Sequence, residues 1–228
     1  MTDGPSPNHG ERRSGAQPDL VVIHYTAMAT CAEARARLCD PVAEVSAHWL
    51  IDTDGTCENL VDETRRAWHA GAGAWGGVRD VNSHSIGIEL QNSGHQPFAA
   101  PQMAALERLL AEILTRWSIP PERVIGHSDM APDRKTDPGP RFDWRRLARL
   151  GLSVWPDPAQ SPLPADLPPL ADSLTAFGYP PAAPELRLAA FRLRFRPWAT
   201  GPADAVDQAL AADLAVRFPC RPGASAAL

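Results

Sequence analysis

The alternation of apolar and polar positions predicts an α/β domain in the first two thirds of the chain. Three short apolar runs, "DLVVIHYTA", "HSIGIEL" and "RVIGH", are typical of buried strands. The segment "VSAHWLIDTDGTCENLV" predicts two strands joined by an Asp-Thr-Asp-Gly turn. Apolar residues recur at helical spacing from Pro101 to Trp117, with the proline near the first turn. Because strands and helices alternate, we expect an α/β fold with a mixed central β-sheet flanked by helices.

The pattern changes after Trp155. The segment "PDPAQSPLPADLPP" is a proline-rich linker, and three helices are expected beyond it: around "LADSLTAFGY", from Pro184 to Arg196 and from Ala203 to Phe218. The N-terminal stretch is polar and rich in Gly, Pro and Ser. These patterns predict a disordered segment at 1–18, an α/β domain at 19–156, a linker at 157–170 and a small C-terminal three-helix module at 171–228.

Composition and charge exclude some partners. The net charge of −5 gives no basic surface for nucleic acid. No run of about 18 apolar residues occurs, so no transmembrane segment is expected. The N-terminus has no apolar stretch of the kind found in secretory signals, which favours a cytoplasmic protein. The alternative is a periplasmic or cell-envelope protein whose signal lies upstream of this sequence.

Polar residues at the ends of the predicted strands are the candidates for chemistry. His24, Glu89 and His127 each lie near such an end, and His127 opens the stiff polar loop "GHSDMAPDRKTDPGP". A catalytic zinc site uses three protein ligands of nitrogen or carboxylate type and keeps an open position. The two histidines and one aspartate of the loop would supply that set. The candidates are Asp129, Asp133 and Asp137, and spacing alone does not choose among them.

A structural role for these residues is the competing interpretation. A single histidine at the end of an apolar strand is more often a hydrogen-bonded structural residue than a metal ligand. On the same reasoning, Glu89 would be an ion-pair partner and Lys135 a solvated charge on the loop.

Four motifs favour the chemical interpretation. "VVIHYTA", "RRAWHAGAGAWGG", "NSHSIGIELQN" and "VIGHSDMAPDRKTDPGPRFDW" together resemble the zinc-dependent N-acetylmuramoyl-L-alanine amidases of the AmpD/AmiD branch, the amidase-2 family. The resemblance runs from about Asp19 to about Pro156, which makes 19–156 the expected catalytic domain. It implies one Zn²⁺ per chain, bound by His24, His127 and Asp137. It also implies catalytic roles for Glu89 and Lys135.

The same resemblance implies an activity and its substrates. The reaction would be hydrolysis of the amide between N-acetylmuramic acid, or its 1,6-anhydro form, and the L-alanine of the stem peptide. The expected partners are therefore peptidoglycan or soluble muropeptides, in cell-wall turnover or recycling. The C-terminal segments "LTAFGY" and "LAAFRLRFRPW" resemble a helical peptidoglycan-binding-like module. The alternative is a non-catalytic peptidoglycan-recognition protein on the same fold, but all three ligand positions are filled here.

Substrate-binding residues are expected in the glycine-rich stretch "RRAWHAGAGAWGG". Trp68, His69 and Trp75 lie there and are predicted to line a groove for sugar and peptide. Core packing explains Trp68 equally well.

Overall fold

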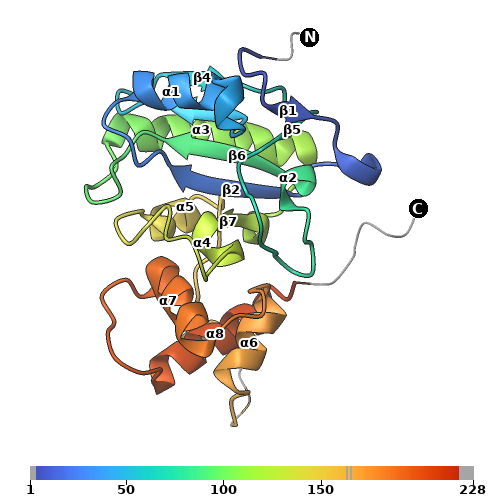
Figure 1. Ribbon diagram of the computed structural model, residues 1–228. Coiled ribbons are helices and arrows are strands. Elements are labelled where there is room, and N and C mark those ends of the chain that lie inside the picture. The colour runs from blue at the N-terminus through green and yellow to red at the C-terminus, as the bar shows by residue number, and fades with distance from the viewer. Residues whose placement is uncertain (1–3, 163, 165, 221–228) are drawn as a thin grey trace.

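A five-stranded mixed sheet forms the centre of the computed structural model, which describes residues 4–162, 164 and 166–220 (Figure 1). The strand order is β4-β3-β6-β2-β7. Strand β2 runs parallel to both β6 and β7, and β3 runs parallel to β6. Strands β3 and β4 form the predicted antiparallel hairpin. The predicted fold class is confirmed, and the strands are β2 Leu20–Tyr25, β3 Trp49–Ile51, β4 Cys57–Asn59, β6 Ser85–Leu90 and β7 Val124–Gly126.

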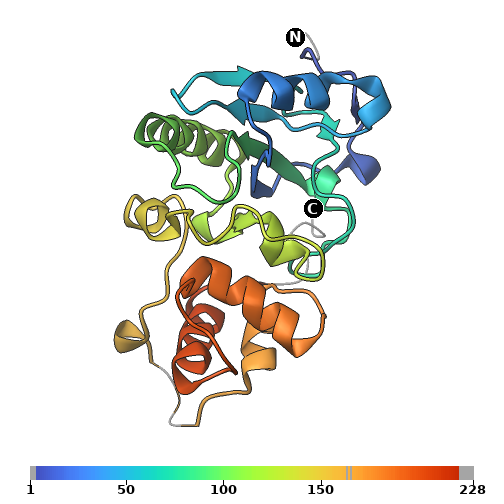
Figure 2. The same ribbon diagram turned by 60° about the vertical axis from the view of Figure 1, so that its left-hand side comes forward.

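Helices cover both faces of this sheet (Figure 2). On one face, the apolar stripe of α3 (Ala100–Trp117) packs against the odd-numbered residues of β2 and the even-numbered residues of β6. On the other face, α1 (Cys31–Cys39) packs Leu38 against Leu50 of β3. The period of two along a strand thus divides the sheet residues between two cores. No helix of the described residues is both long and apolar enough to cross a membrane.

Shorter elements complete the first two thirds of the chain. Their bounds are β1 His9–Gly10, η1 Arg13–Gly15, η2 Pro41–Ala43, β5 Arg66–Ala67, α2 Val81–His84, η3 Pro121–Arg123, α4 His127–Met130 and α5 Trp144–Arg149.

The predicted disorder at 1–18 is wrong for residues 4–18. Strand β1 pairs with β5 in a small antiparallel sheet. Arg12 is 9% exposed, and its guanidinium donates to the backbone carbonyls of Glu63, Ser83 and Ser85. Strand pairing and the hydrogen bonds of Arg12 therefore hold a segment that is too polar to be recognised as ordered from its composition. Residues 1–3 lie outside the described residues.

The three predicted C-terminal helices are present as α6 (Leu170–Phe177), α7 (Pro184–Phe195) and α8 (Ala205–Arg217), after the short η4 (Pro158–Gln160). In Figures 1 and 2 they lie beside α4 and β7, at the end of the sheet far from β4.

These helices do not form a module with its own separate core. Phe177, Phe191 and Leu214 belong to one buried cluster with Ile125 of β7 and Met130 of α4. The expectation of an independent module is therefore corrected: its helices bury their apolar faces against the α/β body. Residues 163 and 165 of the predicted linker and 221–228 of the predicted module lie outside the described residues.

Candidate metal centre and active site

Two of the candidate residues lie side by side because of strand register. His24 of β2 is the register partner of Glu89 of β6 in the parallel pair. Both side chains are on the face opposite α3, since Ile23 and Ile88 point into the α3 core. Strand β7, also parallel to β2, ends at Gly126 and is followed directly by His127, the first residue of α4. The carboxyl ends of three parallel strands thus meet at one edge of the sheet, where α/β folds place their ligand sites.

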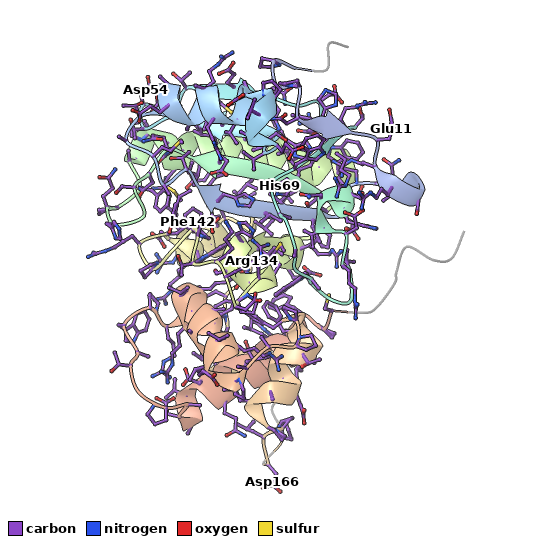
Figure 3. All side chains as sticks on the ribbon, viewed as in Figure 1. Glu11, Asp54, His69, Arg134, Phe142 and Asp166 are labelled. Carbon is purple, nitrogen blue, oxygen red and sulfur yellow. The ribbon has the colours of Figure 1, made fainter. Side chains whose placement is uncertain are left out.

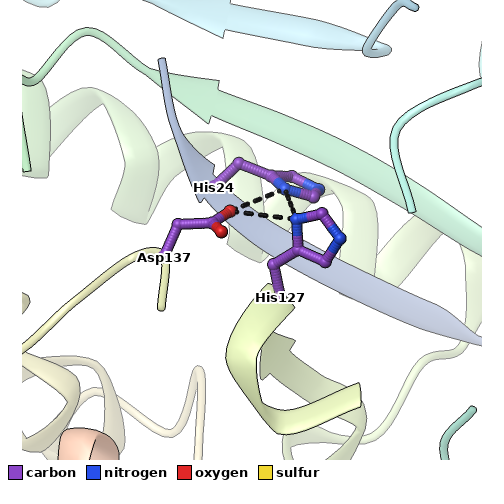
Figure 4. Close-up of side chains that lie close together, drawn as sticks. All are labelled: His24, His127 and Asp137. Carbon is purple, nitrogen blue, oxygen red and sulfur yellow. Dashed lines mark hydrogen bonds and ion pairs between the residues drawn. The ribbon is translucent and has the colours of Figure 1, made fainter. Parts of the chain in front are cut away.

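His24, His127 and Asp137 bring three ligand atoms together (Figure 4). The Nδ1 atoms of His24 and His127 are 2.9 Å apart. Asp137 Oδ2 lies 3.0 Å from Nδ1 of His24 and 3.1 Å from Nδ1 of His127. Zinc–ligand bonds of about 2.1 Å set the ligand atoms of a tetrahedral site roughly 3.4 Å apart. The two nitrogens and one carboxylate oxygen therefore fit a catalytic zinc in both chemistry and spacing.

The geometry distinguishes the three aspartates of the loop. The backbone N–H of Ser128 donates to the Asp137 carbonyl at 2.9 Å, which brings the end of the loop back to the start of α4. Asp129 instead pairs with Arg194 inside the protein, and Asp133 is exposed. Only Asp137 of the three belongs to the cluster of possible ligands among the described residues.

The outward ring nitrogen of His127 is held by the backbone. His127 Nε2 lies 3.0 Å from the carbonyl oxygen of Ala70. A carbonyl only accepts, so Nε2 carries the proton and Nδ1 presents its lone pair to the cluster. Arg134 holds the same segment, since its guanidinium donates to the carbonyls of Ala70 and Ala72.

A second chain of hydrogen bonds fixes His24. The hydroxyl of Ser85 donates to the Val81 carbonyl at 2.5 Å, so its oxygen accepts from Nε2 of His69, 3.1 Å away. Nδ1 of His69 then accepts from Nε2 of His24 at 3.1 Å. This assignment leaves Nδ1 of His24 as the ligand atom. The ring of His69 lies so close to Gly87 that a Cβ there would be 2.4 Å from its Cγ.

His69 was predicted to bind substrate, and the structure gives it a different set of contacts. It borders the cavity of the site, but both of its ring nitrogens bond to protein groups. Figure 3 shows His69 above Arg134, at the level of β2 and β6. The hydrogen bonds of His69 are those of a residue that orients a metal ligand.

A cavity of about 400 Å³ opens over the cluster. Glu89, Lys135 and the three possible metal ligands line it together with Trp68. Glu89 Oε2 is buried and has no hydrogen-bond partner among the described residues. Burial, followed by the negative charge of Asp137, raises the pKa of Glu89 to about 8, and the Lys135 charge opposes this rise.

Burial also governs the ionisation of the possible ligands. Burial, followed by the neighbouring His127, lowers the pKa of His24 to about 4. Burial by itself raises the pKa of Asp137, but the adjacent imidazoles of His127 and His24 outweigh it, and the net pKa is well below the ordinary value. A neutral His24 and an ionised Asp137 are the states that bind a metal cation.

The two tryptophans of the glycine-rich stretch have different surroundings. Trp68 is partly buried and lines the cavity, as predicted. Trp75 is 1% exposed and packs edge-on against Phe177 and Tyr179 of the C-terminal region. The prediction that Trp75 lines the groove is therefore wrong. Its indole fills the core between the α/β body and the C-terminal helices.

A family model for N-acetylmuramoyl-L-alanine amidases matches residues 14–140, the part of the chain that builds this site. The chain belongs to the N-acetylmuramoyl-L-alanine amidase family. It is 38% identical in sequence to the Escherichia coli amidase AmiD, and the match covers 87% of this chain and 83% of that protein. AmpD of Enterobacter cloacae, a 1,6-anhydro-N-acetylmuramyl-L-alanine amidase, is 34% identical over 63% of this chain and 86% of its own length.

Solved structures of the family have the same architecture. E. coli AmiD in complex with anhydro-N-acetylmuramic acid-L-Ala-D-γ-Glu-L-Lys superposes with a TM-score of 0.80 at 36% identity, covering 91% of this chain and 93% of that one. AmpDh3 of Pseudomonas aeruginosa, in complex with an anhydromuramic pentapeptide, gives 0.79 at 31% identity and covers 91% of this chain and 94% of that one. An AmpD structure matches only 66% of this chain, with a TM-score of 0.58. The wider matches extend beyond the α/β body.

Some residues of the site have no signal in the sequence pattern. Ser85 and the Ala70 carbonyl set the histidine tautomers, yet a serine and a backbone carbonyl look the same in any stretch of chain. The glycine inside the strand "SIGIEL" was the available clue, because a strand glycine often marks a close approach by another group. That group is His69.

Proposed function

We propose that this amidase uses zinc to hydrolyse the amide between the lactyl group of N-acetylmuramic acid, in its 1,6-anhydro form, and the L-alanine of the stem peptide. The observation that supports it most directly is the convergence of His24, His127 and Asp137 in one cavity with Glu89, in a member of the N-acetylmuramoyl-L-alanine amidase family. Anhydromuramyl peptides are the ligands named for the AmiD and AmpDh3 structures to which the chain is similar.

The three ligand residues would hold the metal by Nδ1 of each histidine and Oδ2 of Asp137. Zinc bound there supplies a Lewis acid, which lowers the pKa of a water and polarises the scissile carbonyl. Glu89 is the proposed general base and acid. Its raised pKa near 8 suits a carboxyl group that takes a proton from water and returns it to the leaving amine.

Lys135 is the proposed stabiliser of the oxyanion. It lines the same cavity as Glu89 and lies two residues before Asp137. A cation at that place is worth more as negative charge develops on the carbonyl oxygen than in the ground state. Lys135→Met should therefore retain zinc and lower kcat by about 10²- to 10³-fold with little change in KM. A methionine variant with normal turnover would make Lys135 a solvated loop charge.

The substrate proposal is tested by mass spectrometry of the products from two substrates. Soluble anhydromuramyl tripeptide and purified sacculi are each incubated with the zinc-loaded protein. We expect free peptide beginning with L-alanine from the soluble substrate, with the sugar released intact. Cleavage of sacculi alone would contradict the anhydro-muropeptide assignment. Absence of cleavage from both would contradict the enzymatic proposal and favour the recognition protein.

The metal proposal has its own test. The zinc content of the purified protein should be one per chain, and a chelator should abolish activity that added zinc restores. Asp137→Ala removes the carboxylate, one of the three proposed metal ligands, and the variant should lose the metal. Full zinc occupancy in Asp137→Ala would remove Asp137 from the ligand set.

A further inference from the structure

Two residues of the C-terminal region donate hydrogen bonds to the short helix α4. Its first residue is His127, and Asp129 lies two residues further on. The carboxylate of Asp129 is fully buried and accepts three hydrogen bonds. These come from the Gly126 N–H at 2.8 Å, the Tyr179 hydroxyl at 2.6 Å and Arg194 Nη1 at 2.8 Å. Two of these three donors belong to the part of the chain beyond residue 170.

Arg194 of α7 reaches further than Asp129. Its Nη2 donates to the Val124 carbonyl of β7 at 3.0 Å and to Ser153 Oγ at 3.1 Å. Its guanidinium lies 4.3 Å from the centre of the Trp144 ring, within the range of a cation–π contact. Arg194 and Asp129 are each 1% exposed, so this is a fully buried ion pair. One arginine thus ties α7 to the strand before His127 and to the helix that begins with it.

We propose that Arg194 and Tyr179 are positioning residues for the zinc ligand His127, acting through Asp129. The Gly126 N–H donates to the Asp129 carboxylate, and His127 lies between these two residues in the sequence. Fixing that carboxylate fixes the turn from which the imidazole projects. The C-terminal helices are then part of the metal site. The inference rests on the proposed zinc site.

The arrangement explains why a charged pair is buried at this junction. A buried ion pair contributes little net stability compared with apolar residues of similar size, but it enforces one geometry. Metal ligands have to be held within about 0.5 Å of their productive position. Groups that orient ligands from outside the first coordination sphere typically change metal affinity or activity by about 10- to 100-fold.

The chain offers a matched control. Arg192, two residues earlier on α7, forms a second buried ion pair with Asp207 at 2.5 Å. Its other hydrogen bonds go to the carbonyls of Gly201 and Pro202. All of these partners lie in the C-terminal region. Arg192→Met therefore removes a similar ion pair without touching α4.

The experiment compares Arg194→Met with Arg192→Met in the full chain. Zinc affinity is measured by competition with a chelator, and the Co²⁺-substituted proteins are compared by visible absorption, which reports ligand geometry. Both variants should be less stable than the wild type. Only Arg194→Met should lose zinc affinity, by about 10- to 100-fold, with a changed cobalt spectrum. The loss in kcat should exceed the change in KM.

Tyr179→Phe keeps the test decisive if Arg194→Met fails to fold. It removes one hydroxyl that donates to Asp129 and leaves the ring in place. We expect a smaller loss of zinc affinity in the same direction. Wild-type zinc affinity and an unchanged cobalt spectrum in the folded Tyr179→Phe and Arg194→Met variants would overturn the inference. A wild-type protein that binds no zinc would instead overturn the proposed function, so the two failures are distinguishable.

Discussion

At the scale of single residues, Glu89 combines two properties that are unfavourable for stability. Its side chain is only partly exposed, and its Oε2 atom is buried with no hydrogen-bond partner among the described residues. A carboxylate left without partners in the interior costs free energy that the fold does not recover there. Such a residue is retained where its proton chemistry is used.

Glu89→Gln tests that role with almost no change in shape. The amide cannot take up and return a proton, so kcat should fall by about 10²- to 10⁴-fold. Zinc content should be unchanged, and the variant should be at least as stable, since a neutral side chain replaces a buried acid. The measurement is kcat together with bound zinc. Near-normal turnover with full zinc would leave Glu89 a structural residue.

His69 lines the cavity and also bonds to His24, so two roles can be compared for it. If His69 orients His24, replacing His69 should weaken zinc binding by about 10- to 100-fold, because Nε2 of His24 loses its hydrogen-bond acceptor. If it bound substrate instead, KM would rise and zinc affinity would stay. His69→Ala separates the two by zinc titration and steady-state kinetics. His69→Gln, which can still accept a hydrogen bond, should recover part of the affinity.

At the scale of elements, the strands and the long helices could be predicted because their apolar patterns are local. The apolar stripe of α3 predicts a helix, and the β-branched run of β2 predicts a strand. The parallel register that pairs His24 with Glu89 could be anticipated only as a shared strand edge. That the N-terminal segment is ordered could not be predicted, since it depends on carbonyl groups of Glu63, Ser83 and Ser85 that are distant in sequence.

The surroundings of β3 predict a pH dependence. His48, directly before β3, is 0% exposed, and its Nδ1 accepts from the Gly87 N–H at 2.9 Å. Burial, followed by the charge of Arg12, lowers its pKa from 6.5 to about 3. The unfolded chain therefore binds a proton that the folded chain does not between these values. The contribution of His48 is fully present above about pH 6.5 and is lost as the pH falls toward 3.

Urea unfolding of the metal-free protein at several pH values measures this slope. The free energy of unfolding should decrease from pH 7 to pH 4.5. His24 contributes in the same direction, since its pKa is lowered to about 4. His48→Gln should start from a lower stability and show a shallower decrease over that range. An equal slope in the two proteins would mean that His48 is protonated in the folded state.

At the scale of the whole molecule, the C-terminal helices and the α/β body share one core. Trp75, Ile125 and Met130 of the body are buried in the same cluster as Phe177 and Phe191. A glycine at position 178 admits the Trp75 ring, since a Cβ there would lie 2.6 Å from its Cε2. The sequence showed the helices but not this partnership. Whether two apolar faces meet each other is a property of the assembled fold.

The last prediction follows from that shared core. A chain ending at residue 156 would expose the apolar side chains that α6, α7 and α8 cover, and each loses about 2 kcal/mol of burial. Asp129 would also lose both of its donors from the C-terminal region. Several such losses are comparable to the total stability of a typical domain, about 5–15 kcal/mol. We therefore expect residues 1–156 alone to be aggregated or only partly folded.

The complete chain should instead unfold in a single transition. Tryptophan fluorescence, which includes Trp75 at the junction, and far-ultraviolet circular dichroism should give the same midpoint in urea. Arg192→Met, which weakens only the C-terminal helices, should lower that midpoint for both probes together. Two separate transitions, or a truncated chain with native zinc affinity and full stability, would mean that the helices are an appendage. Coincident transitions would mean that the helices and the metal site fold as one unit.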